Sequence, residues 1–471
     1  MCSICAISSS GNSRETLTDL VKLIFSGENR GNESIGAAAY NGKFVCAKRM
    51  GVNLDALGYD LLRSMGDAGI SAGVGQTRYS TSGQSDIDHA QPFTIKGKSE
   101  FVINHNGTVA NAQELVKKHG LPVKTHSDTE ALGQLIAGYS DIETGIREAS
   151  KDAIGGWNLS LLEPDGTIYV FRDPMGFSPL FYQQDEEGFT AASEDSALFA
   201  VGRFAPERVE PGELLVVREG RSERRRLVKP TLTECPFEPA YFMKTGSTYR
   251  DDLVHDIRRD IGWILGKREG LRGDDVVVMP ILESGRYYAE GLADAADLEY
   301  AEGLMKNRGK RVYMHPDERA KIGGTWNRQD WAALKHVPLP PVVRGKRLIV
   351  TDDSIVRGDT TRVVTKNLRT AGAAEVHWRI GFPPVKWGCI YKMDHQKRSE
   401  LIAARAQDAH AHTERYVTRF VGADSVHYPT WAEVRSVLES NEDFGRDNHC
   451  TACFTGKYPT RVPEEARRAI E

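Results

Sequence analysis

The sequence lacks an apolar run long enough to cross a bilayer. A membrane-spanning helix needs roughly 20 mainly apolar residues, whereas the longest obvious run, residues 276–282, is short and contains Pro280. The first residues also lack the basic segment and long apolar stretch of a secretory signal. We therefore expect a cytoplasmic protein with no membrane partner.

An excess of charge of one sign is also missing. The 61 Lys and Arg residues nearly balance the 65 Asp and Glu residues, which gives a net charge of -4. This balance argues against a nucleic-acid partner, because no broad positive field is available, and any anion site must be local. Cysteine is scarce as well: seven scattered cysteines do not suggest a disulfide framework, which favours catalytic or metal-binding roles.

The length and patterning indicate an α/β protein with more than one domain. A chain of 471 residues exceeds what one hydrophobic core organises. Short strand-like segments alternate with polar turns in the first half, at residues 35–40, 101–105, 159–162 and 168–171, and predict a mixed α/β sandwich. The arginine-rich residues 218–226 are either a linker or an exposed strand edge. We place the boundary just beyond them, giving domains 2–230 and 231–471.

The second half has the pattern of alternating strands and helices. Apolar residues from Leu253 to Leu265 have helical spacing. Buried strands are predicted at 276–279, 347–350 and 376–380, with helices beginning near Glu283 and Thr360. Right-handed crossovers would assemble these units into a parallel sheet that binds ligands at the carboxyl ends of its strands.

Cys2 is the first candidate catalytic residue. Removal of Met1 would place a thiol and a free α-amino group on one residue, and an amine with an ordinary pKa of about 8 can accept the thiol proton. Three later residue sets could bind charged groups of a substrate. Arg78, in the segment GQTRYSTSG at 75–83, can grip a carboxylate; Asn106 and Gly107 offer donors to an oxyanion; Asp128 can hold an ammonium group.

Each of these segments also has a simpler structural interpretation. Asn106 and Gly107 could form a hairpin turn. The spacing of Ser127 and Glu130 is that of a capping box at a helix start.

Together the segments resemble the glutaminase domain of class II glutamine amidotransferases, and specifically the glutamine phosphoribosylpyrophosphate amidotransferase family. Further matching segments are residues 29–34, 172–180, 192–194 and 209–213. The resemblance implies an N-terminal nucleophile αββα sandwich. It also implies Cys2 as nucleophile, Arg78 and Asp128 as glutamine ligands, and Asn106 with Gly107 as oxyanion hole. Ser3, where the family usually has Gly, and Cys5, where it has an apolar residue, depart from the pattern. We expect Cys5 to be buried.

Residues 348–361 (LIVTDDSIVRGDTT) form the most specific motif. Adjacent carboxylates at a strand end repel each other and need a compensating cation, hydroxyl or developing positive charge. Gly358 and the hydroxyls of Thr360 and Thr361 open a helix whose amino end can bind phosphate. A plain acidic helix cap is the alternative.

This motif resembles the phosphoribosyl pyrophosphate loop of type I phosphoribosyltransferases. The resemblance implies a parallel-sheet phosphoribosyltransferase domain in which Asp352 and Asp353 contact the ribose and Mg2+. The expected phosphate and pyrophosphate ligands are Ser354, Gly358, Asp359, Thr360, Thr361 and Lys306. A surface basic cluster is the simpler interpretation of Lys306. The segment 309–336 departs from the family's mobile flap: where the family has a Lys-Leu-Asn-like segment, residues 333–335 read Ala-Leu-Lys, with Lys335 last.

Four cysteines suggest a metal site. Cys450 and Cys453 have the spacing to bind one metal, and Cys235 and Cys389 bring the number of thiols to four. The spacing alone leaves a [4Fe-4S] cluster, Zn2+ and unpaired thiols open. Family members of the cluster-containing type have cysteines in these contexts, so the resemblance implies [4Fe-4S]. Cys46 has no such counterpart and is expected in the core.

The combined resemblance implies a bifunctional amidophosphoribosyltransferase. Glutamine and phosphoribosyl pyrophosphate would yield 5-phosphoribosylamine, the first step of de novo purine synthesis. Alternatives are a related enzyme with another acceptor or pathway, and a non-catalytic nucleotide-sensing relative. By family analogy we also expect a homotetramer inhibited by purine nucleotides.

Overall fold

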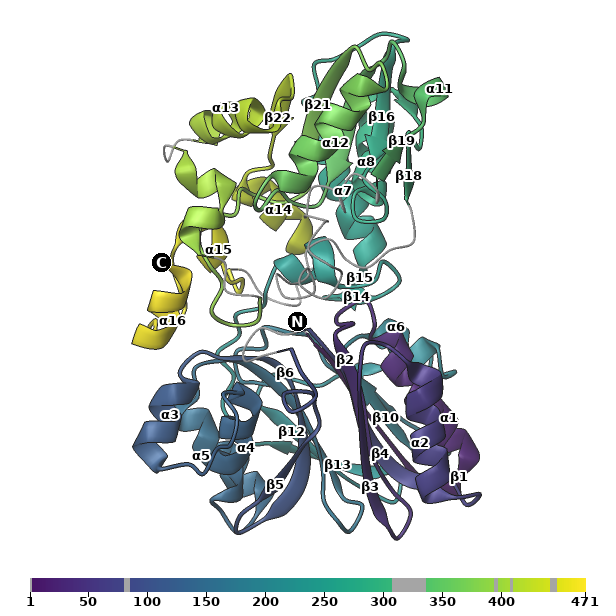
Figure 1. The fold of residues 1–471 in the computed structure, drawn as a ribbon, viewed down its shortest axis with the longest axis vertical. Coiled ribbons are helices and arrows are strands. Elements are labelled where there is room, and N and C mark those ends of the chain that lie inside the picture. Colours follow the sequence, from purple (N-terminus) through teal and green to yellow (C-terminus); the bar gives the residue numbers. More distant parts are fainter. Residues whose placement is uncertain (1, 80–84, 307–335, 394–396, 407–409, 441–446) are drawn as a thin grey trace.

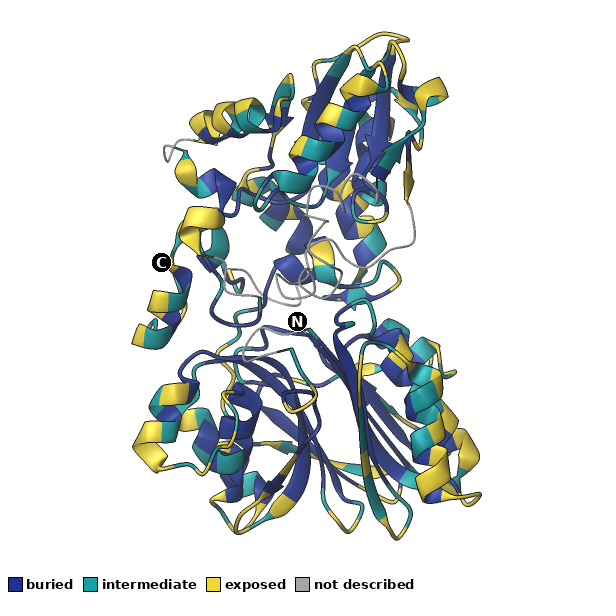
Figure 2. Ribbon diagram, viewed as in Figure 1, coloured by how far each residue is buried: buried dark blue, intermediate teal, exposed yellow. Residues whose placement is uncertain are grey.

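The protein consists of a two-sheet sandwich and a parallel-sheet half stacked on one end of it (Figure 1). The computed structural model describes residues 2–79, 85–306, 336–393, 397–406, 410–440 and 447–471. Buried residues concentrate in the sheets, whereas exposed residues lie mainly on outward helix faces and loops (Figure 2). None of the helices in these ranges is long and apolar enough to cross a membrane.

The first sheet of the sandwich has seven strands in the order β11-β9-β10-β1-β4-β2-β3, and neighbouring strands are antiparallel. Their bounds are β1 (Ser3–Ser13), β2 (Ser34–Tyr40), β3 (Phe44–Met50), β4 (Ile70–Arg78), β9 (Phe181–Gln184), β10 (Phe189–Ala192) and β11 (Glu207–Arg208). Its outer face is covered by α1 (Arg14–Ser26), α2 (Leu54–Met65) and α6 (Asp195–Phe199) (Figure 1). Helix α1 buries Leu17, Leu20 and Ile24, which recur at helical spacing.

The second sheet has six antiparallel strands in the order β13-β12-β8-β7-β6-β5. Their bounds are β5 (Phe93–Lys96), β6 (Glu100–Val109), β7 (Gly155–Leu162), β8 (Ile168–Phe171), β12 (Glu213–Arg218) and β13 (Arg221–Arg226). Helices α3 (Ala112–His119), α4 (Asp128–Ala137) and α5 (Ile142–Asp152) lie outside it (Figure 1). The predicted αββα sandwich is therefore confirmed, and the arginine-rich residues form an exposed edge strand.

The two cysteines expected in the core of the sandwich differ. Cys5 on β1 is buried, and burial raises the pKa of its thiol to about 12. Cys46 lies on β3 and is exposed, so its expected core position is wrong. The reason is that β3 is the last strand of its sheet and none of its residues is fully buried.

The second half is built on a parallel sheet in the order β17-β16-β20-β21-β22, as predicted. Its strands are β16 (Val276–Pro280), β17 (Glu299–Tyr300), β20 (Arg347–Asp352), β21 (Glu375–Ile380) and β22 (Ser425–His427). Val276 and Val278 pack with α7 (Val254–Lys267) and α8 (Arg286–Ala296). Val277 and Met279 pack in the cluster of α12 (Asp359–Thr370) and α13 (His410–Val421). Both faces of the sheet are thus covered, which explains the continuous apolar strands.

Smaller elements connect these layers. They are η1 (Glu238–Phe242), β14 (Thr248–Tyr249), β15 (Asp252–Leu253), β18 (Leu304–Lys306), β19 (His336–Pro338), α11 (Pro340–Val343), η2 (Arg398–Glu400), η3 (Ile402–Arg405), α14 (Trp431–Leu438), α15 (Ala452–Thr455) and α16 (Glu464–Ile470). A bridge between Glu234 and His449 joins the segment that leaves the sandwich to the carboxyl-terminal segment.

Candidate active sites of the two halves

Cys2 lies immediately before β1, at the end of the sandwich that meets the other half. Its side chain is buried, and its Sγ donates to the carbonyl of Tyr79 at 3.6 Å. The pairing of Ser3 with Thr77 brings the start of β1 beside the end of β4, where Arg78 is also buried. The structure therefore brings the predicted nucleophile close to the predicted carboxylate ligand.

Asn106 and Gly107 reach the same end of the sandwich from the other sheet. Asn106 Nδ2 donates to Ser193 Oγ at 3.4 Å, and that oxygen accepts from the backbone N–H of Ile4 at 3.0 Å. This bridge ends two residues from Cys2. Asn106 and Gly107 both lie inside β6, so the alternative of a hairpin turn is wrong.

The backbone explains why residue 107 is a glycine. Its φ is 148°, and an added Cβ would lie 1.8 Å from the carbonyl oxygen of Gly156. No other residue fits this position without moving β7.

Asp128 begins α4 and is buried at the edge of this group. Its Oδ2 accepts from the backbone N–H of Val109 at 2.9 Å. The ring of His105 lies 4.0 Å from the same oxygen, and burial lowers the pKa of His105 despite that carboxylate. The alternative of a capping box is wrong, because Ser127 makes no capping hydrogen bond and Glu130 instead accepts from Thr125.

The acidic pair of the second half lies at the carboxyl end of the central strand β20. Ser284 Oγ donates to Asp352 Oδ1 at 2.7 Å, and Ser354 Oγ donates to Asp353 Oδ2 at 2.6 Å. Burial, and then the neighbouring Asp353, raise the pKa of Asp352 well above its ordinary value; burial also raises the pKa of Asp353. Ionisation of both carboxylates is therefore unfavourable, and a bound cation or cationic group would make it favourable.

The loop after the acidic pair leads into α12. Gly358 has a φ of 81° and precedes Asp359, the first residue of the helix. Thr361 is buried and Thr360 is half-buried in the first turn. The amino end of a 12-residue helix thus follows directly from the acidic pair, as a phosphate cradle requires.

Two predictions near this site have different outcomes. Lys306 ends β18 opposite His336 and is exposed. This position is compatible both with a pyrophosphate ligand and with a surface basic cluster. Lys335 and residues 307–335 of the flap lie outside the described residues.

The four predicted metal-binding cysteines converge beside the junction of the halves. Cys450 N–H donates to the carbonyl of Glu234, the residue before Cys235, at 2.8 Å, and the carbonyl of Cys453 accepts from Trp387 N–H at 3.0 Å. Burial raises the pKa of Cys235 to about 11. Burial also raises the pKa of Cys453 well above its ordinary value, and the other three thiols raise it further. In the described ranges, no three His, Cys, Asp or Glu side chains form a group that could hold a metal ion.

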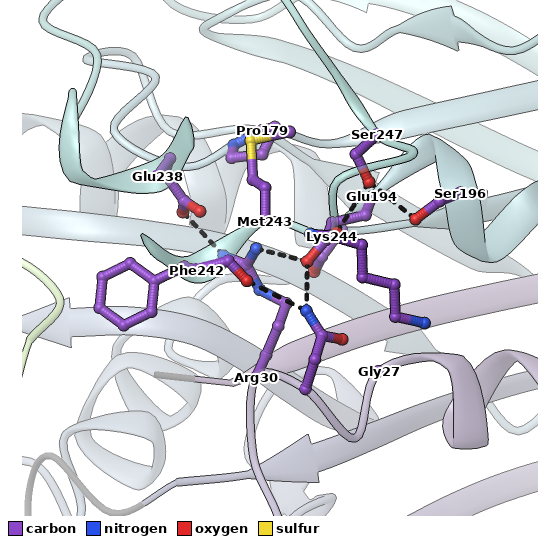
Figure 3. Close-up of polar contacts among 12 residues, drawn as sticks. Gly27, Arg30, Pro179, Glu194, Ser196, Glu238, Phe242, Met243, Lys244 and Ser247 are labelled. Carbon is purple, nitrogen blue, oxygen red and sulfur yellow. Dashed lines mark hydrogen bonds and ion pairs between the residues drawn. The ribbon is translucent and has the colours of Figure 1, made fainter. Parts of the chain in front are cut away.

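Sequence reasoning missed a buried charge network between the halves (Figure 3). Arg30 pairs with Glu194 and Glu238, and Lys392 also contacts Glu238. Arg30 and Glu194 lie in segments that resemble the family, but no role was predicted for either residue.

Comparison with known proteins identifies the family. Residues 76–200 match the family model described as a glutamine amidotransferase domain. The amidophosphoribosyltransferase of Archaeoglobus fulgidus is 33% identical over 456 residues, which are 94% of each chain. That of Mycobacterium bovis is 34% identical over 468 residues, covering 95% of this chain and 85% of the relative. This chain belongs to the amidophosphoribosyltransferase family.

Two solved structures agree with this assignment to the amidophosphoribosyltransferases. The glutamine phosphoribosylpyrophosphate amidotransferase from B. subtilis, complexed with ADP and GMP, has a TM-score of 0.82 and 27% identity, covering 98% of both chains. A structure described as the allosteric regulatory enzyme of purine biosynthesis has a TM-score of 0.84 and 27% identity, covering 99% of this chain and 97% of the other. The predicted family, α/β fold and enzyme class are therefore confirmed: the chain is a glutamine-dependent glycosyltransferase of purine biosynthesis.

Proposed function

We propose that this enzyme converts glutamine, phosphoribosyl pyrophosphate and water into 5-phosphoribosylamine, glutamate and pyrophosphate. One observation carries the proposal. A buried thiol beside Arg78 and Asn106 occurs in the same chain as an acidic pair, half-buried Asp352 and buried Asp353, that precedes a helix amino end. Neither set alone would couple amide hydrolysis to substitution at a ribose.

In the sandwich, Cys2 Sγ attacks the side-chain amide carbon of glutamine. Arg78 binds the substrate carboxylate and Asp128 its α-ammonium group, while Asn106 Nδ2 and Gly107 N–H stabilise the oxyanion. Once Met1 is removed, the α-amine of Cys2 takes the thiol proton and delivers it to the departing ammonia. Water then hydrolyses the thioester to glutamate and restores the thiol.

In the parallel-sheet half, ammonia attacks C1 of the ribose while pyrophosphate leaves. Asp352 and Asp353 orient the ribose hydroxyls and stabilise the positive charge that develops on the ring. The 5-phosphate binds at Asp359, Thr360 and Thr361, with Ser354 and Gly358 shaping the turn. Lys306 contacts the pyrophosphate.

The acidic pair also fits a magnesium site. Two adjacent carboxylates with raised pKa values offer hard oxygen ligands whose mutual repulsion a divalent cation would relieve. Mg2+ held there would neutralise charge on the leaving pyrophosphate.

The four converging cysteines support a [4Fe-4S] cluster at Cys235, Cys389, Cys450 and Cys453. The thiols raise one another's pKa values, and the backbone N–H of Tyr391 points at Cys389 Sγ at 3.5 Å, a contact that stabilises thiolate sulfur.

One comparison supports regulation by nucleotides, and the expected assembly rests on the family resemblance. The B. subtilis relative was solved with ADP and GMP. We expect purine nucleotides to inhibit this enzyme and its subunits to form a homotetramer in the cytoplasm.

The test is a comparison of nitrogen sources. Wild-type protein should release pyrophosphate with either glutamine or ammonia, whereas Cys2→Ala should lose the glutamine reaction and keep the ammonia reaction. Loss of both reactions would contradict this division of labour. Mass spectrometry of the product distinguishes phosphoribosylamine from the product of another acceptor.

The cluster has a separate test. Iron and sulfide determinations on anaerobically prepared protein should give four of each per chain for [4Fe-4S]. Zinc without sulfide would support the alternative metal site.

A further inference from the structure

Arg30 connects three segments at the junction between the halves (Figure 3). Its Nη1 donates to Glu194 at 2.9 Å, its Nη2 donates to Glu238 at 2.7 Å, and its Nε donates to the carbonyl oxygen of Cys2 at 3.1 Å. The Arg30 side chain is fully buried. Because a guanidinium group is planar and rigid, the positions of the two carboxylates determine where its Nε points.

Glu238 is the member of this network that comes from beyond the sandwich. It begins η1, whereas Arg30 and Glu194 flank strands of the first sheet. Lys392 approaches the same Glu238 oxygen from the carboxyl-terminal segment and also donates to the carbonyl of Phe177 at 3.3 Å. The group that orients Arg30 is therefore fixed by contacts from both halves.

The turn η1 is anchored by helices that cover the parallel sheet. Arg258 on α7 donates to the carbonyls of Pro239 and Met243, both at 2.8 Å. Tyr288 on α8 donates to the carbonyl of Ala240 at 3.0 Å. These bonds satisfy three carbonyl groups of a short buried turn and fix Glu238 relative to the second half.

The network is charged at neutral pH. Although burial opposes ionisation of Glu238, Arg30 and Lys392 outweigh it and lower the pKa of Glu238 to about 2. Two cations and two carboxylates thus balance in a buried space. Replacing one carboxylate by an amide would leave an uncompensated positive charge and release one end of Arg30.

We propose that Glu238 is a positioning residue of the glutaminase site, which acts through Arg30 on the backbone of Cys2. The amino-terminal site is then complete only when η1 is docked against it. This inference rests on the proposed function, because it requires Cys2 to be the nucleophile. Glu238 contacts neither substrate; it fixes the direction from which the thiol meets the oxyanion donors.

Glu238→Gln and Glu269→Gln form a matched pair of variants. Glu269 is also a buried carboxylate paired with a buried arginine, Arg379, at 2.5 Å, but it lies two residues after the end of α7 and is not part of η1. Both variants remove one buried negative charge. A purely structural effect should therefore appear in both.

For Glu238→Gln we expect kcat with glutamine to fall by roughly tenfold to a hundredfold, since a small misplacement of a nucleophile has effects of this size. The KM for glutamine should stay within about threefold, because Arg78 and Asp128 are untouched. Pyrophosphate release driven by ammonia should be retained. Glu269→Gln should leave the glutamine-to-ammonia ratio at the wild-type value, and thermal unfolding reports any shared loss of stability.

Two outcomes would overturn the inference: equal glutamine-to-ammonia ratios in both variants, or a rise in KM with kcat unchanged. If Glu238→Gln does not fold, Tyr288→Phe removes one anchor of η1 without leaving a buried charge. It should lower kcat with glutamine by about twofold to fivefold, and an unchanged kcat would likewise overturn the inference. Full glutamine turnover in Cys2→Ala would instead refute the proposed function itself.

Discussion

Glu238 is fully buried, and in the Asp352–Asp353 pair Asp353 is buried and Asp352 half-buried, yet the pKa values of these acidic groups move in opposite directions. Arg30 and Lys392 overcome the effect of burial on Glu238 and lower its pKa to about 2. Burial and Asp353 raise the pKa of Asp352 well above normal. A buried carboxylate whose charge is neutralised by nearby cations of the protein stabilises its surroundings. A carboxylate without such a cation, whose pKa is raised, is typical of a site that a ligand completes.

The largest test of this contrast is Asp352→Asn. We expect both the glutamine and the ammonia reaction to fall by roughly a hundredfold to a thousandfold, because charge stabilisation at the ribose is lost. The thermal midpoint should rise, by roughly 2–4 °C for each 1 kcal/mol gained, because two buried charges no longer repel. Steady-state pyrophosphate release and thermal unfolding measure the two effects. Lower stability would show that the pair is compensated after all.

Gly107→Ala should separate the two sites. The new Cβ would meet the Gly156 carbonyl at 1.8 Å in a backbone conformation that disfavours side chains. We expect roughly a hundredfold loss of glutamine turnover and a destabilisation of about 1–3 kcal/mol, while the ammonia reaction persists. Gly42→Ala is a suitable control, since Gly42 also has a positive φ but open space around it. An equal loss of the ammonia reaction would contradict the separation.

Acid should weaken the compensated carboxylates. The folded-state pKa values of Glu234 and Glu238 are lowered from 4.5 to about 2, so their stabilisation is fully present above pH 4.5. It is lost as the pH falls from 4.5 towards 2, because the unfolded chain then binds more protons. The free energy of unfolding should decrease by on the order of 3 kcal/mol per group, measured by urea unfolding across this range. Glu238→Gln should flatten the decrease, and an unchanged slope would contradict the assignment.

The smallest expected effect is that of Cys46→Ser. This exposed thiol on an edge strand lies apart from the four converging cysteines. Its removal should leave iron content and both reactions unchanged and should alter stability by less than about 0.5 kcal/mol. In contrast, Cys450→Ser should lower the iron content. Equal iron loss in both variants would refute the proposed ligand set.

Local patterns in the sequence predicted most of the fold. The short strands of the first half, the helical spacing before Leu265 and the alternation of strands and helices in the second half are local signals, and the structure bears them out. Helix α8 begins at Arg286 rather than near Glu283. The reason is that the residues before it form a turn in which Gly285 packs against the Thr351 carbonyl. That contact crosses 66 positions and has no local signature.

The charge network is the clearest part of the site that sequence reasoning could not reach. Arg30 lies 164 residues from Glu194 and 208 from Glu238, and nothing near any of them indicates its partner. Motifs predicted a set of residues for contact with substrate. The residues that aim Cys2 depend on how the two halves pack, which only three-dimensional structure provides.

The bond between Lys392 and Glu238 has a consequence for biosynthesis of the chain. Residue 2 leaves the ribosome first, but the carboxylate that orients its surroundings acquires its second cation only after residue 392 has been translated. A nascent chain truncated before that point would contain the whole sandwich with an incomplete catalytic centre. Amide hydrolysis would therefore start late in synthesis, when the acceptor half is present to use the ammonia.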